Sequence, residues 1–170
     1  MRDGTILLYK VPEKHATFIQ KAIRYFTKKP YHHVAVYFDG STLEEGTGGY
    51  AHTLGVNIAS EYWEPEMEMS DMECARARAF VMIVDGEGIR HHWPYNYLLT
   101  FIMFVVYPTR WFWNKIKWVP FSSTLLGANC SSFVDKFWKY VGRDIKPKWM
   151  EALSVPGDLR GLPGFQSIQG

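Results

Sequence analysis

Residues 33–46 constrain the fold of this chain more than any other segment, because they carry the signature of a β-hairpin. The run His33-Val34-Ala35-Val36-Tyr37-Phe38 alternates as a strand does, and Asp39-Gly40 follows it. Asp-Gly is one of the dipeptides preferred in two-residue hairpin turns. We therefore expect an antiparallel strand pair with Val34, Val36 and Phe38 facing a core and His33 on the opposite face.

The length of this turn decides which of two glutamates lies beside His33. A two-residue turn places Glu44 opposite Ala35, on the face that carries His33. A turn one residue longer places Glu45 there instead. The two-residue register also sends Leu43 to the core, which favours Glu44. Both glutamates remain candidates for a carboxylate that orients the imidazole by accepting its second proton.

Cys130 marks a second constrained segment, where a loop is expected to become an amphipathic helix that stops at Gly142. The apolar residues on one face of this helix are Phe133, Val134, Phe137, Trp138 and Val141. At the first turn, unpaired backbone amides stabilise a thiolate, lower its pKa from about 8.5 and can hold an oxyanion. A lone cysteine is more often structural, so only its combination with His33, a following acidic strand and the motif order described next predicts a nucleophile.

The motifs and their order resemble a known group of enzymes. Strand-borne His33-Val34-Ala35-Val36-Tyr37 precedes Asn129-Cys130-Ser131-Ser132-Phe133-Val134, and Gly4-Thr5-Ile6-Leu7-Leu8 opens the chain. In this order they resemble the circularly permuted papain-fold hydrolases, relatives of the NlpC-type cell-wall endopeptidases and of lecithin:retinol acyltransferase. Further counterparts are Ala22 to Thr27, Tyr31-His32-His33, Gly55-Val56, Tyr95-Asn96-Tyr97 and Val155-Pro156-Gly157-Asp158-Leu159.

The resemblance implies one α+β domain over residues 1–170, with a circularly permuted papain-like fold and an antiparallel sheet packed against helices. It implies a cysteine hydrolase in which Cys130 attacks an amide, His33 transfers the proton and Glu44 or Glu45 orients the imidazole. The substrate it suggests is a peptide bond in bacterial peptidoglycan. Because Asn129-Cys130 is closer to the acyltransferase branch, a lipid-directed thiol hydrolase or acyltransferase is the alternative. The third interpretation is that the chain is a catalytically silent module with a structural role in a virion.

Composition sets the remaining limits. Hydrophobic residues make up 47% of the 170 residues, enough for one full core, and the net charge of +2 gives no field that would favour a nucleic-acid partner. The other cysteine, Cys74, is expected to be a buried apolar residue. The adjacent pairs His32-His33 and His91-His92 cannot chelate a metal from a regular strand, so neither metal nor cofactor is predicted.

Two further expectations concern location. Met1 to Gly4 leads directly into a strand, so we expect no signal peptide, synthesis in the cytoplasm, and delivery to any cell wall by a virion or by lysis. The apolar segment 93–109 is bracketed by Pro94 and Pro108 and is too short to span a bilayer. A buried helix is expected there, with peripheral membrane contact through the following Trp- and Lys-rich stretch as the alternative.

Several other elements follow from periodicity and capping signals. We expect a strand from Ile6 to Lys10 and a helix from Glu13 to Lys28. A strand is expected around Gly55 to Tyr62. The capping box Ser70-Asp71-Met72-Glu73 should open a helix that stops at Asp85-Gly86. Another helix is expected from about Tyr95, and the tail from Asp144 should wrap the surface.

Overall fold

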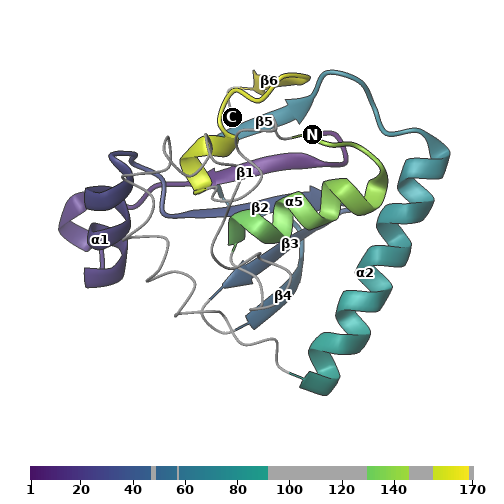
Figure 1. Ribbon diagram of the computed structural model, residues 1–170, viewed down its shortest axis with the longest axis horizontal. Coiled ribbons are helices and arrows are strands. Elements are labelled where there is room, and N and C mark those ends of the chain that lie inside the picture. The colour runs from purple at the N-terminus through teal and green to yellow at the C-terminus, as the bar shows by residue number, and fades with distance from the viewer. Residues whose placement is uncertain (47–48, 57, 92–129, 146–154, 169–170) are drawn as a thin grey trace, which may run out of the picture.

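One antiparallel sheet organises the chain, whose computed structural model describes residues 1–46, 49–56, 58–91, 130–145 and 155–168 (Figure 1). The six strands lie in the order β4-β3-β2-β1-β5-β6, and every neighbouring pair is antiparallel. The expected α+β class, with an antiparallel sheet packed against helices, is confirmed. The strands are β1 (Thr5–Tyr9), β2 (His33–Phe38), β3 (Ser41–Gly46), β4 (Gly49–Leu54), β5 (Glu61–Pro65) and β6 (Phe165–Ile168).

The central hairpin has the predicted two-residue turn. Phe38 pairs with Ser41, and Ala35 pairs with Glu44. Asp39 and Gly40 have φ values of 49° and 76°, both in the left-handed region that this type of turn requires. The register that favours Glu44 is therefore the one that forms.

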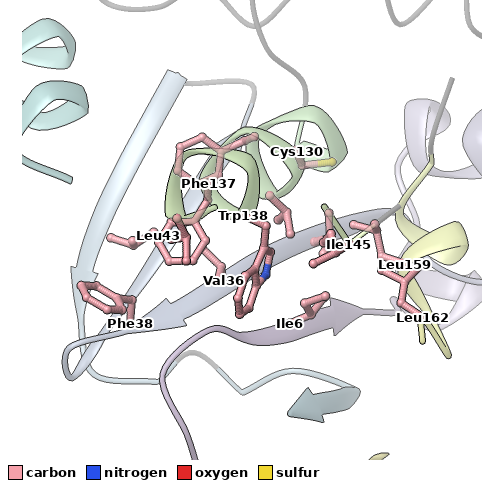
Figure 2. Close-up of a cluster of buried hydrophobic side chains, with 14 of the residues drawn as sticks. Ile6, Val36, Phe38, Leu43, Cys130, Phe137, Trp138, Ile145, Leu159 and Leu162 are labelled. Carbon is pink, nitrogen blue, oxygen red and sulfur yellow. The ribbon is translucent and has the colours of Figure 1, made fainter. Parts of the chain in front are cut away.

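Helix α5 (Cys130–Val141) packs across one face of the sheet and makes the main core (Figure 2). Trp138 and Phe137 on this helix are fully buried, and they meet the inward side chains of β1, β2 and β3. The indole lies so close to the start of β1 that a Cβ at Gly4 would stand 2.4 Å from it. Gly4 also has a φ of 84°, so both the contact and the backbone require glycine there.

Helix α2 (Asp71–His91) packs beside α5 and begins at the predicted capping box. The Ser70 backbone N–H donates to Glu73 Oε2 at 2.8 Å, and the Glu73 N–H donates to Ser70 Oγ at 3.4 Å. The predicted stop at Asp85-Gly86 is wrong, since the helix continues to His91. A glycine inside a helix costs only about 1 kcal/mol relative to alanine, so Gly86 alone is a weak stop signal.

The predicted helix from Glu13 to Lys28 is divided in two. A short 3-10 turn, η1 (Glu13–His15), precedes helix α1 (Phe18–Thr27). Thr17 separates them because its hydroxyl accepts from the Gln20 N–H, while the Gln20 side chain accepts from the Thr17 N–H at 2.9 Å. This capping box starts a new helix at the point where the sequence periodicity suggested continuation.

Two expectations about later segments are wrong. The strand expected around Gly55 to Tyr62 is found only at its end: among the described residues of this range, Gly55 leaves β4 with a φ of 88° and β5 begins at Glu61. The tail does not simply wrap the surface. Its residues Val155 to Leu159 are buried around η4 (Pro156–Leu159), and β6 adds a strand to the sheet. Burial of Asp158, whose carboxylate meets Lys29 Nζ at 2.6 Å, anchors this tail.

Other expected features lie outside the described residues, namely the helix from about Tyr95, the apolar segment 93–109 and His92. Within the described ranges, no helix combines the length and the apolar character needed to cross a membrane.

The capping residue Glu73 also ties α2 to the end of α5. Arg143 donates from Nε to Glu73 Oε1 at 2.6 Å and from Nη2 to Oε2 at 2.8 Å. This hydrogen-bonded pairing, with the Ser70 contacts, lowers the Glu73 pKa from 4.5 to about 2 although burial opposes the shift. Removing the negative charge should therefore weaken both the helix start and the link between helices.

We predict that Glu73→Gln lowers the free energy of unfolding by about 1 to 2 kcal/mol at neutral pH, measured by urea denaturation. A carboxyl with a depressed folded pKa stabilises above its unfolded pKa of 4.5 and loses that contribution as pH falls toward 2. The difference from wild type should therefore shrink in acid. Glu68→Gln, at an exposed ion pair of 3.7 Å with Arg2, is the control and should change stability by less than about 0.5 kcal/mol. A difference that stayed constant with pH would contradict this assignment.

Candidate active site

Cys130 is the first residue of α5 and lies against the strand that carries His33. Its side chain is buried, and the backbone N–H of Val34 donates to its sulfur. Figure 2 shows Cys130 at the rim of the hydrophobic cluster, with the sulfur directed away from Phe137 and Trp138. Val34 comes one residue before Ala35, where the pairing of β2 with β3 begins, so the N–H that meets the sulfur lies just outside that pairing.

His33 begins β2 and connects two other candidate residues. Its Nε2 lies 2.7 Å from Glu44 Oε2, and its imidazole also hydrogen-bonds with the Cys130 side chain. Because Nε2 is occupied by the carboxylate, Nδ1 is the nitrogen left for the thiol. The structure thus brings Cys130, His33 and Glu44 together from α5, β2 and β3.

Cys130, His33 and Glu44 each shift the pKa of a neighbour toward the value that favours its charged form. Burial alone lowers the His33 pKa, but the interactions with Cys130 and Glu44 outweigh it and raise the value from 6.5 to about 10. Burial alone raises the Cys130 pKa, yet the His33 and Val34 interactions lower it overall. The hydrogen bond with His33 also lowers the Glu44 pKa. Together these shifts favour a thiolate beside an imidazolium that is held by a carboxylate.

Glu45 does not join this arrangement, which corrects its candidacy as the orienting residue. It follows Glu44 on β3, so its side chain points to the opposite face and is 0% exposed in the core under α5. Among the described residues, neither carboxylate oxygen has a hydrogen-bond partner, and burial raises the pKa to about 7. The two adjacent glutamates therefore have opposite environments.

Two neighbours of His33 were not identified by the sequence reasoning. Tyr9 pairs with His33 across the β1–β2 ladder, and their ring centroids lie 5.5 Å apart. Burial raises the Tyr9 pKa, so its hydroxyl stays protonated. His32 donates its backbone N–H to the Tyr9 carbonyl, and burial lowers its imidazole pKa to about 4. Only the pairing of β1 with β2, which no local motif specifies, places Tyr9 beside the imidazole.

The described residues contain no group of three or more His, Cys, Asp or Glu side chains that could hold a metal ion. Comparisons with protein-family profiles, curated proteins and solved structures found no match. The site must therefore be interpreted from its own geometry. A thiol at a helix N-terminus can act as a nucleophile and exchange a proton when it interacts with an imidazole that a carboxylate holds in turn.

The two cysteines should differ in how alkylation depends on pH. Cys74 has a pKa raised mainly by burial, whereas the Cys130 pKa is lowered. Between about pH 8 and pH 6, iodoacetamide labelling should slow about 100-fold at Cys74, whose pKa lies above this range, and by a smaller factor at Cys130. Peptide mass spectrometry measures both rates in one sample. His33→Ala should give Cys130 the steep dependence of an ordinary thiol, and equal slopes at both cysteines in the wild type would refute the ion pair.

Proposed function

We propose that this chain is a cysteine hydrolase that cleaves an amide bond. The observation that carries the proposal is the position of His33, which interacts with Cys130 on one side and lies 2.7 Å from Glu44 on the other. The order thiol, imidazole, carboxylate is the arrangement that nucleophilic catalysis by a cysteine requires. Cys74 has no histidine among its described partners: its Sγ donates to the Met69 carbonyl at 3.9 Å, and the groups that influence its charge are Asp3, Arg78, Asp71 and Glu73.

In the proposed reaction, the Cys130 thiolate attacks the substrate carbonyl carbon to form a tetrahedral intermediate. The His33 imidazolium then gives its Nδ1 proton to the leaving amine nitrogen, and the C–N bond breaks to leave a thioester. A water molecule loses a proton to the now neutral imidazole and attacks the thioester. The C–S bond breaks, the acid product leaves, and the thiolate–imidazolium pair is restored.

The start of α5 would stabilise the negative charge that develops on the substrate oxygen. The first N–H groups of a helix have no partner within it, and the helix dipole places partial positive charge at that end. Cys130 is the first residue of the helix, so its amide lies next to the attacking sulfur. It is our candidate for one donor to the oxyanion.

We also propose that the fold is a circularly permuted papain-like one. The support is the combination of a cysteine at the start of a helix, an antiparallel sheet under that helix, and a histidine on a strand earlier in the chain. This is the motif order on which the resemblance to NlpC-type enzymes rests. That resemblance suggests a peptide bond of bacterial peptidoglycan as the substrate.

Substitutions within the proposed triad should be non-additive. Cys130→Ala and His33→Ala should each abolish turnover, and the double variant should lose little more, because the residues act as a unit. Glu44→Gln should lower kcat by about 100-fold or more, since it removes the charge that holds the imidazolium. The adjacent Glu45→Gln is the matched control, because its carboxyl lies on the other face, and should keep near wild-type kcat. Equal losses from the two glutamine variants would contradict the assignment.

The substrate proposal is tested by incubating the protein with purified peptidoglycan sacculi and identifying the products by mass spectrometry. We expect new amine and carboxyl termini in the stem or cross-linking peptides, and none with Cys130→Ala. A parallel incubation with phospholipid vesicles tests the acyl alternative, in which lysolipid or transferred acyl chains would appear instead. If both sacculi and lipids stayed intact, both substrate proposals would be wrong. The proposal that Cys130 is a nucleophile would still stand if its alkylation followed the predicted pH dependence.

A further inference from the structure

The first residue of β2 pairs with one neighbouring strand only, among the strands that the structure describes. His33 pairs with Tyr9 of β1, whereas the pairing of β2 with β3 begins at Ala35. The unpaired end of a strand is where a sheet opens at the lowest cost in free energy. The position of the His33 backbone therefore depends on β1 and on residues 28–32, which lead from α1 into β2.

The tail contacts this leading segment through Lys29. Lys29 Nζ donates to Asp158 Oδ1 at 2.6 Å and to the Gly157 carbonyl at 3.0 Å. The Asp158 side chain is 1% exposed, and its other oxygen accepts from the Val155 N–H at 3.2 Å, which fixes the carboxylate within the turn of η4. A buried carboxylate requires such partners, because removing its charge from water is costly. The pair joins one point of residues 28–32 to one point of the tail.

Gly157 brings the tail directly against the same residues. A Cβ on Gly157 would stand 2.4 Å from Lys29 Cδ, 2.9 Å from Lys29 Cβ and 3.1 Å from Tyr31 Cδ2. Tyr31 is itself buried, and its hydroxyl donates to Glu61 Oε1 at 2.6 Å. Arg160 of the tail donates to the other oxygen of that carboxylate at 2.9 Å. The tail therefore holds the leading segment at two points, with no space for a side chain between them.

The tail is anchored in the core at the end where β2 begins. Leu159 and Leu162 are buried, and both belong to the cluster under α5. Figure 2 shows them at the end of this cluster opposite Phe38, the last residue of β2. The turn η4 contacts both β1 and α5, the helix that begins with Cys130. The tail thus connects the leading segment to the element that holds the thiol.

We propose that the tail is a positioning element of the candidate active site, in which Asp158 holds Lys29 and thereby sets where His33 stands relative to Cys130. Desolvation offsets most of the attraction in a pair with a buried carboxylate, so its contribution is to fix one arrangement of the two segments. A hydrogen bond weakens steeply once its geometry departs from the optimum, so a small shift of the imidazole is enough to weaken its pairing with the thiol. This inference rests on the role that the proposed function gives to His33, but its test reads the imidazole and the thiol and not turnover.

The first test is Asp158→Asn, which keeps the shape of the side chain and removes the charge that holds Lys29. We expect Cys130 alkylation by iodoacetamide at about pH 6 to slow about tenfold, the effect of one pKa unit, while the Cys74 rate changes less than about twofold. The His33 imidazolium should also lose its proton at lower pH than in the wild type, where its pKa is raised to about 10. Imidazole nitrogen chemical shifts measure this titration, and His33→Gln identifies the signals.

A second variant, Lys29→Met, separates positioning from a direct effect of charge. Asp158→Asn removes a negative charge and Lys29→Met a positive one, so a purely electrostatic influence would move the His33 pKa in opposite directions. Loss of positioning should move it downward in both and slow Cys130 alkylation in both. Gly157→Ala changes no charge but places a methyl group 2.9 Å from Lys29 Cβ, and it should act in the same direction. It keeps the proposal testable if the charge variants do not fold.

The matched control is Glu73→Gln, which also removes an internal ion pair but lies at the end of α5 opposite Cys130. It should leave the pH dependence of Cys130 alkylation unchanged, and an equal effect there would overturn the proposal, because loss of stability alone would then explain the result. Wild-type behaviour of Asp158→Asn and Lys29→Met, or opposite shifts in the two, would overturn it as well. A wild-type protein in which Cys130 responds to pH as Cys74 does would overturn the thiolate–imidazolium pair itself, and with it the proposed function.

Discussion

The packing of α5 on the sheet is the contact on which the rest of the structure depends. Its fully buried side chains, with Trp138 the largest, fill the space above β1, β2 and β3, and the indole is close enough to Gly4 to exclude any side chain there. Because interiors are close-packed, such a helix has little freedom to slide or rotate. Its first residue, Cys130, is therefore held at a fixed position against Val34 and His33. The hydrophobic core thus sets the geometry of the candidate nucleophile.

Burial disfavours charged side chains at this site, so the charge states of Cys130 and His33 depend on the groups with which they interact. Burial alone would leave both Cys130 and His33 neutral, because removing an isolated charge from water is costly. Placed together, and with Glu44 on the second imidazole nitrogen, each group stabilises the charged form of the other. Glu45 gives the contrast within the same strand. It is buried with no described hydrogen-bond partner, so burial raises its pKa, whereas the partners of Cys130 and Glu44 lower theirs.

The two ends of the molecule are built differently. At one end, Arg143 joins α5 to α2 through Glu73 and donates further hydrogen bonds to the Met67 and Glu68 carbonyls. At the other end, α1 carries exposed aromatic and basic side chains beside the start of β2. The proposed chemistry lies at the second end, where β2 begins with His33.

Local signals in the sequence determined the hairpin, the glycine that ends α5, the capping box of α2 and the position of Cys130 at a helix start. Each depends on residues within a few positions of one another, such as Asp39-Gly40 for the turn and Ser70 with Glu73 for the cap. The two-residue turn sets the register in which Glu44, and not Glu45, shares a face with His33. The same local signals misplaced the end of α2 and proposed one helix where Thr17 starts a second.

Only the tertiary structure decided which distant segments meet. The pairing of β1 with β2 placed Tyr9 beside His33, and the pairing of β5 with β6 buried a tail that had been expected to lie on the surface. No local motif specifies such contacts, because they form between segments far apart in the chain and depend on how whole faces pack. The sequence supplied the residue types available for a site and the local elements that carry them. Packing decided their distances, their burial and hence their charge.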